Sequence, residues 1–127
     1  MNTERVVYSF FIILALTLNF GFFLGGIDNV AHHNIYELFA AVVVNLIATV
    51  FKFGDRTYTG AMLLASSLVA DLHLLAAVLV WVVAVYANGA MLDGPVMSAI
   101  VSLAGGALLA NFVSVVMLVV EILALRR

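Results

Sequence analysis

The stretch LVADLHLLA, residues 68–76, places an aspartate and a histidine inside one of the most apolar parts of the sequence. A carboxylate can bind a proton or a small cation, and an imidazole can take up and release a proton. Asp71 lies 13 residues after Tyr58, where the surrounding apolar segment begins. That is ~20 Å along a helix at ~1.5 Å per residue, near the middle of a bilayer. Because an unpaired charge there costs ~2.5 kcal/mol or more, Asp71 and His73 are candidates for a functional site.

Helix geometry separates these two side chains. Residues two apart on a helix point about 200° away from each other, so Asp71 and His73 do not pair. Ser67 shares the side of Asp71, whereas Ser66 shares the side of His73. Both polar sides of this helix then have to be shielded from lipid. Another subunit or a water-filled path could shield the second side, or a helix break near position 71 could change the geometry. We favour a homo-oligomer in which this segment is central.

The composition is that of an integral membrane protein. Of the 127 residues, 66% are hydrophobic and only 9% charged, whereas a soluble domain is about half apolar and a quarter charged. With no cysteine, disulfides, thiolate metal sites and cysteine nucleophiles are excluded. A net charge of -2 provides no basic patch for nucleic acid. The expected partners are the lipid bilayer, other helices and small solutes, and no cofactor motif is present.

Four segments are long and apolar enough to cross a bilayer core, which takes ~20 residues of helix. They cover about residues 6–24, 35–53, 58–87 and 95–125. The first is too long for the apolar part of a signal peptide and no clear A-x-A site follows it, so we interpret it as a retained span. The connections are too short to separate domains. The sequence therefore predicts one transmembrane domain over residues 1–127, an all-α four-helix bundle with antiparallel up-down topology.

The basic residues all fall on one side of this topology. They are Arg5, Lys52, Arg56, Arg126 and Arg127. By the positive-inside rule, both termini and the turn at residues 54–57 face the cytoplasm. Asp28, the two loop histidines and Asp93 then face the opposite side.

Polar side chains also mark the other spans. Glu37, Ala41, Asn45 and Thr49 repeat every four residues, so one face of the second span avoids lipid. Glu37 is favoured as a helix-capping residue paired with Asn34. For Asn45 a hydrogen bond to another helix is favoured over binding of a solute.

The first and last spans add further polar groups. Asn19 is interpreted as another interhelical hydrogen bonder. Asn111, Ser114 and Glu121 fall on one side of the fourth span. Glu121 lies near the cytoplasmic end, where an ion pair with Lys52, Arg56 or the terminal arginines is favoured.

Small residues predict where helices approach closely. The fourth span carries a ladder at steps of four, and the first carries one such step. The ladder residues are Ser98, Ser102, Gly106, Ala110 and Ser114, and the single step is Gly21 to Gly25. Such ladders bring backbones together in lipid. Packing within one subunit is favoured here, with contact between subunits as the alternative.

A metal site is conceivable only in the first loop. His33 and Glu37 have the i, i+4 spacing of two ligands, and His32 adjoins them. However, no fuller ligand motif is present, and solvated-loop and capping roles are favoured. No phosphate-binding loop and no catalytic triad spacing occurs, so enzymatic activity is not expected.

The run NIYELFAAVVVNLIATVFKFGDRT at residues 34–57, preceded by NFGFF at 19–23, resembles a small family of uncharacterised proteobacterial inner-membrane proteins. The similarity covers most of the chain. That family is defined by a domain of unknown function, so the resemblance implies a bacterial inner-membrane setting and no activity.

The sequence supports two main functional hypotheses and a less favoured third. The first is a homo-oligomer that conducts, transports or senses a small cation or proton through Asp71, supported by His73, Ser67, Asn45 and Asn111. The second is a non-transporting accessory or structural subunit of a larger membrane complex, with its polar residues joining helices. The third is a periplasm-facing metal or ligand sensor that uses His32 and His33.

Overall fold

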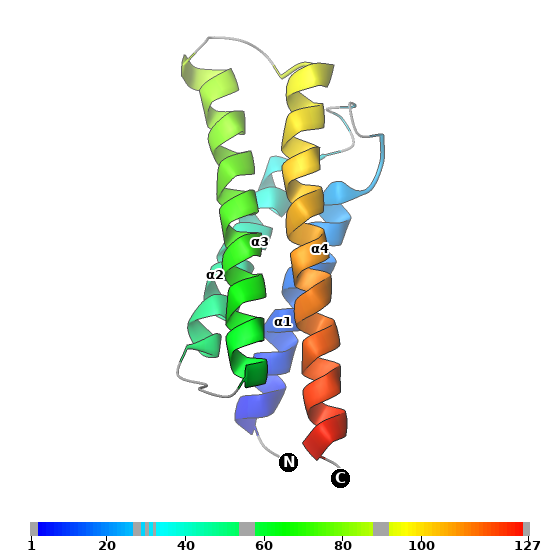
Figure 1. The fold of residues 1–127 in the computed structure, drawn as a ribbon. Coiled ribbons are helices and arrows are strands. Elements are labelled where there is room, and N and C mark those ends of the chain that lie inside the picture. The colour runs from blue at the N-terminus through cyan, green and yellow to red at the C-terminus, as the bar shows by residue number, and fades with distance from the viewer. Residues whose placement is uncertain are drawn as a thin grey trace.

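The computed structural model is an all-α bundle (Figure 1) and describes residues 3–26, 29, 31, 33–53, 58–87 and 92–125. Its helices are α1 (Thr3–Phe23), α2 (Ile35–Lys52), α3 (Tyr58–Val82) and α4 (Gly94–Leu125), and α3 continues into a π-helical turn, η2 (Val83–Ala87). All four long helices are long and apolar enough to cross a membrane. When η2 is counted with α3, the four predicted spans agree with these helices to within three residues at every end.

The helices run alternately up and down, so α1 begins and α4 ends at the same end of the bundle (Figure 1). α3 packs against both α2 and α4, and α1 also packs against both. Each helix therefore has two neighbours. The side of the membrane on which this end lies stays a prediction from the positions of the basic residues.

Local side-chain chemistry sets the helix ends. Asn34 caps α2, its Oδ1 accepting from the Tyr36 backbone N–H at 2.7 Å. Asp93 caps α4 by accepting from the Val96 N–H at 2.9 Å. Gly25 follows the end of α1 with a φ of 101°, a conformation that glycine adopts without strain.

The position of Gly25 after the end of α1 corrects the expected packing step from Gly21 to Gly25. Because Gly25 lies beyond the helix, it does not form a small-residue packing step with Gly21. Gly21 alone makes the close approach, since a Cβ there would lie 2.5 Å from Glu37 Oε2. The carboxylate of Glu37 thus lies against α1, while Asn34 provides the observed cap.

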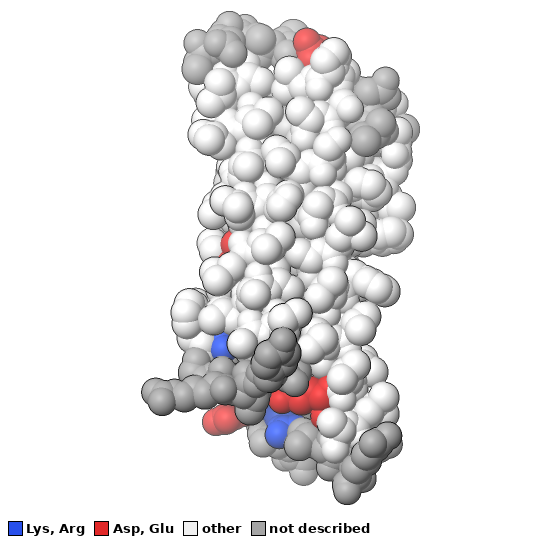
Figure 2. Space-filling model, in the orientation of Figure 1, with Lys and Arg blue, Asp and Glu red and all other residues white. Residues whose placement is uncertain are grey.

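The bundle is built with small side chains inside and large ones outside. Many of the fully buried apolar residues are alanines, which lets the helix backbones approach closely. They include Ala41, Ala70, Ala77, Ala104 and Ala107. Large apolar residues such as Leu72, Leu79 and Leu109 are exposed instead. Figure 2 shows few Lys, Arg, Asp or Glu side chains on the face between the two ends of the molecule.

The two sides of α3 both meet neighbouring helices within one chain, although His73 is only half-buried. Asp71 contacts Thr49 of α2, whereas His73 lies over Gly106 of α4. α3 is continuous through position 71, and its only irregular part among the described residues is η2. A second subunit is therefore not needed to cover either side chain, and the argument for a homo-oligomer loses its premise. Self-association stays a prediction.

The small-residue ladder of α4 packs inside the subunit along its second half. Gly106 accommodates the imidazole of His73, Ala110 is buried, and Ser114 hydrogen-bonds to side chains of α2 and α3. Towards the start of α4, Ser98 is half-buried and Ser102 is exposed. The ladder thus serves contact within one chain where it meets α3.

We expect Gly106→Val to destabilise the bundle, because a Cβ at this position would lie 2.5 Å from His73 Cδ2. Overpacking of this kind costs ~1–3 kcal/mol. The matched control is Ser102→Val, one turn earlier on an exposed position, which should stay within ~0.5 kcal/mol of wild type. Unfolding in detergent measures both. Adding His73→Ala to Gly106→Val should restore most of the loss, and failure of that rescue would contradict the assigned contact.

Candidate functional site

A buried ammonium group joins three helices near the end of α2. Lys52, the last residue of α2, is only 2% exposed. Its Nζ donates to the hydroxyl of Ser67 on α3 and to that of Ser114 on α4, the latter at 3.0 Å. Neutral hydroxyls solvate the ammonium but do not neutralise it. When Asp71 is ionised, its carboxylate is the charge that compensates this ammonium.

The protons of the hydroxyl groups beside Lys52 can be assigned by counting. Ser66 Oγ donates to the Leu63 carbonyl at 3.0 Å. It also lies 2.6 Å from Ser114 Oγ. Since a hydroxyl has one proton, Ser114 must be the donor in that second bond. Ser114 therefore turns its proton towards Ser66 and presents a lone pair to Lys52.

The carboxyl of Asp71 meets α2 through a threonine. Thr49 Oγ1 lies 2.5 Å from Asp71 Oδ2 and 2.8 Å from the backbone carbonyl of Asn45. Both oxygens accept when Asp71 is ionised, yet Thr49 has one proton to give. Thr49 Oγ1 either shares its one proton between these two oxygens, or donates to Asn45 alone while a protonated Asp71 donates to Thr49. Asp71 itself is 7% exposed.

Two buried oxygens in this region lack a donor. Asp71 Oδ1 and Asn45 Oδ1 have no hydrogen-bond partner in the part of the chain that the structure describes. Asn45 instead donates to the Ala41 carbonyl of its own helix at 2.6 Å, which corrects the expectation of a bond to another helix. Buried polar atoms are rarely left unpaired. The unpaired oxygen of Asp71, whose other oxygen contacts Thr49, favours a proton, a water or a small cation as ligand.

A second polar contact lies elsewhere and joins α1 to α4. In the amide orientation that satisfies its neighbours, Asn19 donates to the Ala104 carbonyl and accepts from the Leu108 N–H and Asn111 Nδ2, all at 3.0 Å. Ala104 and Leu108 are the pair that bond each other in an ideal α-helix. The expected interhelical role of Asn19 is confirmed. Asn111 is engaged here and does not contact Asp71.

His73 also stays apart from Asp71. Its Nδ1 lies 2.9 Å from the Val69 carbonyl of its own helix, and its ring lies over Gly106 on the α4 side. Of the supporting residues predicted for Asp71, the structure thus brings Ser67 and Asn45 to the same region and places His73 and Asn111 elsewhere.

The candidate metal ligands of the first loop have other contacts. His33 is buried, with Nδ1 2.6 Å from the Phe22 carbonyl and Nε2 2.8 Å from the Gly26 carbonyl. Both ring nitrogens thus lie within hydrogen-bond distance of backbone carbonyls rather than of another candidate ligand. His32 lies outside the described residues. Among those described, no three His, Cys, Asp or Glu residues form a metal-binding group.

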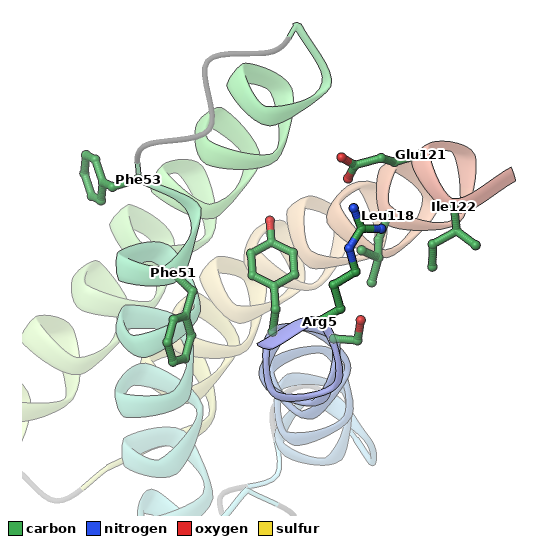
Figure 3. Close-up of a pocket in the computed structure, with 8 residues that line it drawn as sticks. Arg5, Phe51, Phe53, Leu118, Glu121 and Ile122 are labelled. Atoms are coloured by element: carbon green, nitrogen blue, oxygen red, sulfur yellow. The ribbon is translucent and has the colours of Figure 1, made fainter. Parts of the chain in front are cut away.

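Glu121 lies at the end of the bundle where α1 begins. It borders a cavity of about 230 Å³ together with Arg5, Phe51 and Leu118. Figure 3 shows the guanidinium of Arg5 pointing towards Glu121. Lys52, one of its expected partners, is bonded to serines instead. The other expected partners, Arg56, Arg126 and Arg127, lie outside the described residues.

From the sequence, Lys52 was an indicator of topology and an expected partner of Glu121, and Thr49 had no role beyond its helix face. A signal for both was present. Asn45, Thr49 and Lys52 follow one another at steps of four and three, which places all three on one face of α2. A lysine at a span end ordinarily extends its ammonium to the interface, so its burial could be seen only with α3 and α4 in place.

Residues 32–122 match the model of a family described as "Family of unknown function (DUF6394)". Because the match covers more than half of the sequence, the chain belongs to that family. No curated protein and no solved structure matches it. Family membership therefore brings no activity, and the function has to be argued from the geometry.

We expect Asn19→Ala to weaken the contact of α1 with α4 by ~1–2 kcal/mol, since intramembrane hydrogen bonds contribute up to about this much. Thr17→Ala is the matched control, because Thr17 is exposed and bonds only within α1, to the Leu14 carbonyl. It should cost less than ~0.5 kcal/mol. Asn111→Ala should add little to Asn19→Ala in the double variant. Full additivity in unfolding experiments would contradict the shared hydrogen bond.

Proposed function

We propose that this member of the DUF6394 family is a multi-pass membrane protein that binds, and moves or senses, a proton or a small monovalent cation at a buried site centred on Asp71. The supporting observation is the carboxyl of Asp71, with one oxygen bonded to Thr49 and the other buried without a donor among the described residues. A carboxyl that serves only to join helices is expected to have both oxygens paired.

The surroundings of Asp71 suit a reversible charge. Lys52 provides a buried positive charge whose direct hydrogen bonds go to serines rather than to the carboxylate. Asn45 adds a second buried acceptor without a donor in the described chain. Breaking a buried ion pair by removing one partner ordinarily costs several kcal/mol. Because Lys52 and Asp71 interact without a direct hydrogen bond, another cation can replace Lys52 as the partner of the carboxylate.

The proposed setting is the bacterial inner membrane, with both ends of the chain in the cytoplasm. The resemblance of residues 34–57 supports the compartment, and the distribution of the five basic residues supports the orientation. In Figure 2, basic and acidic side chains gather towards the end where α1 begins. Lys52 then lies nearer the cytoplasm and Asp71 deeper in the membrane.

A second candidate function is that of an accessory subunit in a larger membrane complex. It is favoured by an apolar groove of about 530 Å³ between α1 and α4, which a helix of a partner would fill. The groove is lined by Leu16, Thr17, Phe20, Leu108, Leu109 and Phe112. No residue of the Asp71 region contributes to it, so the two functions can be tested separately.

A photoreactive side chain at Leu109, in this groove, tests the accessory function. We expect a stoichiometric adduct with one other membrane protein if the chain is an accessory subunit. The matched control is the same group at Leu72, which is exposed on α3. An adduct with a second copy of this chain would indicate self-association instead, and adducts with lipid alone at both positions would contradict both forms of assembly.

Purified protein in liposomes tests the proposed role of Asp71. We expect Asp71→Asn to lower proton or monovalent-cation flux at least about tenfold, because the amide cannot alternate between charged and neutral forms. Asp93→Asn is the matched control: it removes a carboxylate at the end of the bundle while retaining an oxygen that can cap α4. Equal flux from wild type and Asp71→Asn would contradict the role of Asp71 in transport.

A further inference from the structure

We infer that a proton and the ammonium of Lys52 are alternative partners of the Asp71 carboxylate, so that proton uptake by Asp71 releases Lys52 to the hydroxyls of Ser67 and Ser114. This inference rests on the proposed function. It names the proton as the ligand and Lys52 as the group that regulates its binding.

The serine side of this exchange is oriented to receive a cation. Ser66 donates to the Leu63 carbonyl, which obliges Ser114 to donate to Ser66. A lone pair of Ser114 is thereby directed at Lys52, which donates to it at 3.0 Å and also donates to Ser67. The hydroxyls thus form a fixed resting place for an ammonium group.

The carboxyl side fits the protonated form in this arrangement. Thr49 is close to both Asp71 Oδ2 and the Asn45 carbonyl, at 2.5 and 2.8 Å. A proton on Asp71 makes both contacts full two-centre hydrogen bonds, with Asp71 donating to Thr49 and Thr49 donating to Asn45, whereas the carboxylate has to share the one proton of Thr49 with the Asn45 carbonyl. In this arrangement the ammonium of Lys52 is hydrogen-bonded to the two serines. A protonated Asp71 carboxyl is neutral and needs no positive partner.

The two resting places are one helical turn apart. Ser67 and Asp71 are four residues apart on α3, so they lie on one face at a separation of ~6 Å. Lys52 follows Thr49 by three residues on α2, and Thr49 already contacts Asp71. The four-carbon stem of lysine is flexible enough to carry its ammonium over this distance. A change of rotamer, without movement of a helix, completes the exchange.

The charges balance in both states. When the carboxylate of Asp71 gains a proton, an O–H bond forms, no covalent bond breaks, and Lys52 keeps its charge. The cluster then carries one positive charge, against none when Lys52 pairs with the carboxylate. From α4 the neutral Ser114 contacts Lys52, and His73 lies over Gly106 on the other side of α3.

The ligand we assign is a proton rather than a metal cation. A hard metal ion takes six or more oxygen ligands, whereas the oxygens gathered here come from Asp71, Thr49 and Asn45. The positive charge of Lys52 also opposes a second fixed cation nearby. A proton needs one acceptor and leaves Lys52 to the serines.

The test is an infrared pH titration of the protein in lipid nanodiscs, following the carbonyl band of a protonated carboxyl that disappears in Asp71→Asn. In Lys52→Gln we expect this band to persist to a pH higher by about one unit or more, a tenfold change in proton binding. In Ser67→Ala/Ser114→Ala we expect the opposite shift, because Lys52 then favours the carboxylate. Ser102→Ala, an exposed ladder position, is the matched control and should not shift.

Opposite shifts in these two variants support the exchange, because a merely structural role would not move the band in opposite directions. Unchanged titration in both overturns it, even where Asp71→Asn still lowers flux and so upholds the proposed function. Absence of a titrating band from Asp71, together with flux equal to wild type in Asp71→Asn, overturns both. The single variants Ser67→Ala and Ser114→Ala decide the direction if Lys52→Gln does not fold.

Discussion

The buried ammonium of Lys52 is the constraint on which the polar interior depends. Removing such a charge from water costs several kcal/mol unless hydrogen bonds and an opposite charge offset it. Ser67 and Ser114 supply the hydrogen bonds from two other helices. Asp71 supplies the opposite charge when it is ionised. Three helices are therefore held in register by one side chain.

Small residues make these bonds possible. A serine hydroxyl is so close to its backbone that Ser66 and Ser114 reach 2.6 Å only when α3 and α4 nearly touch. Ala70 and Ala107 are fully buried in the same packed core. Gly106 permits the close approach on the side of His73. The packing of α3 on α4 and the hydrogen bonds to Lys52 thus depend on the same short separation.

Much of the fold could be predicted because its signals are local. Span lengths follow from hydropathy, and caps such as Asn34 follow from the residues beside them. The opposed directions of Asp71 and His73 were also correct geometry. The sequence did not require an oligomer. The helix that packs against a given face of α3 is set by residues far away in the sequence, which local patterns do not show. Lys52 was missed for the same reason, because its partners lie on α3 and α4.

The same arrangement explains how a bundle of four helices with an alanine-rich interior can handle a charge. A hydrated ion needs room, and the residues around Asp71 are packed closely. A proton needs only an acceptor and a compensating change nearby, which an ammonium on a flexible stem provides. In the exchange we propose, Lys52 moves between hydroxyls and carboxylate, and charge is rearranged over one helical turn while the backbones stay in place. The proposed proton exchange is compatible with stable packing, because the moving part is a single side chain.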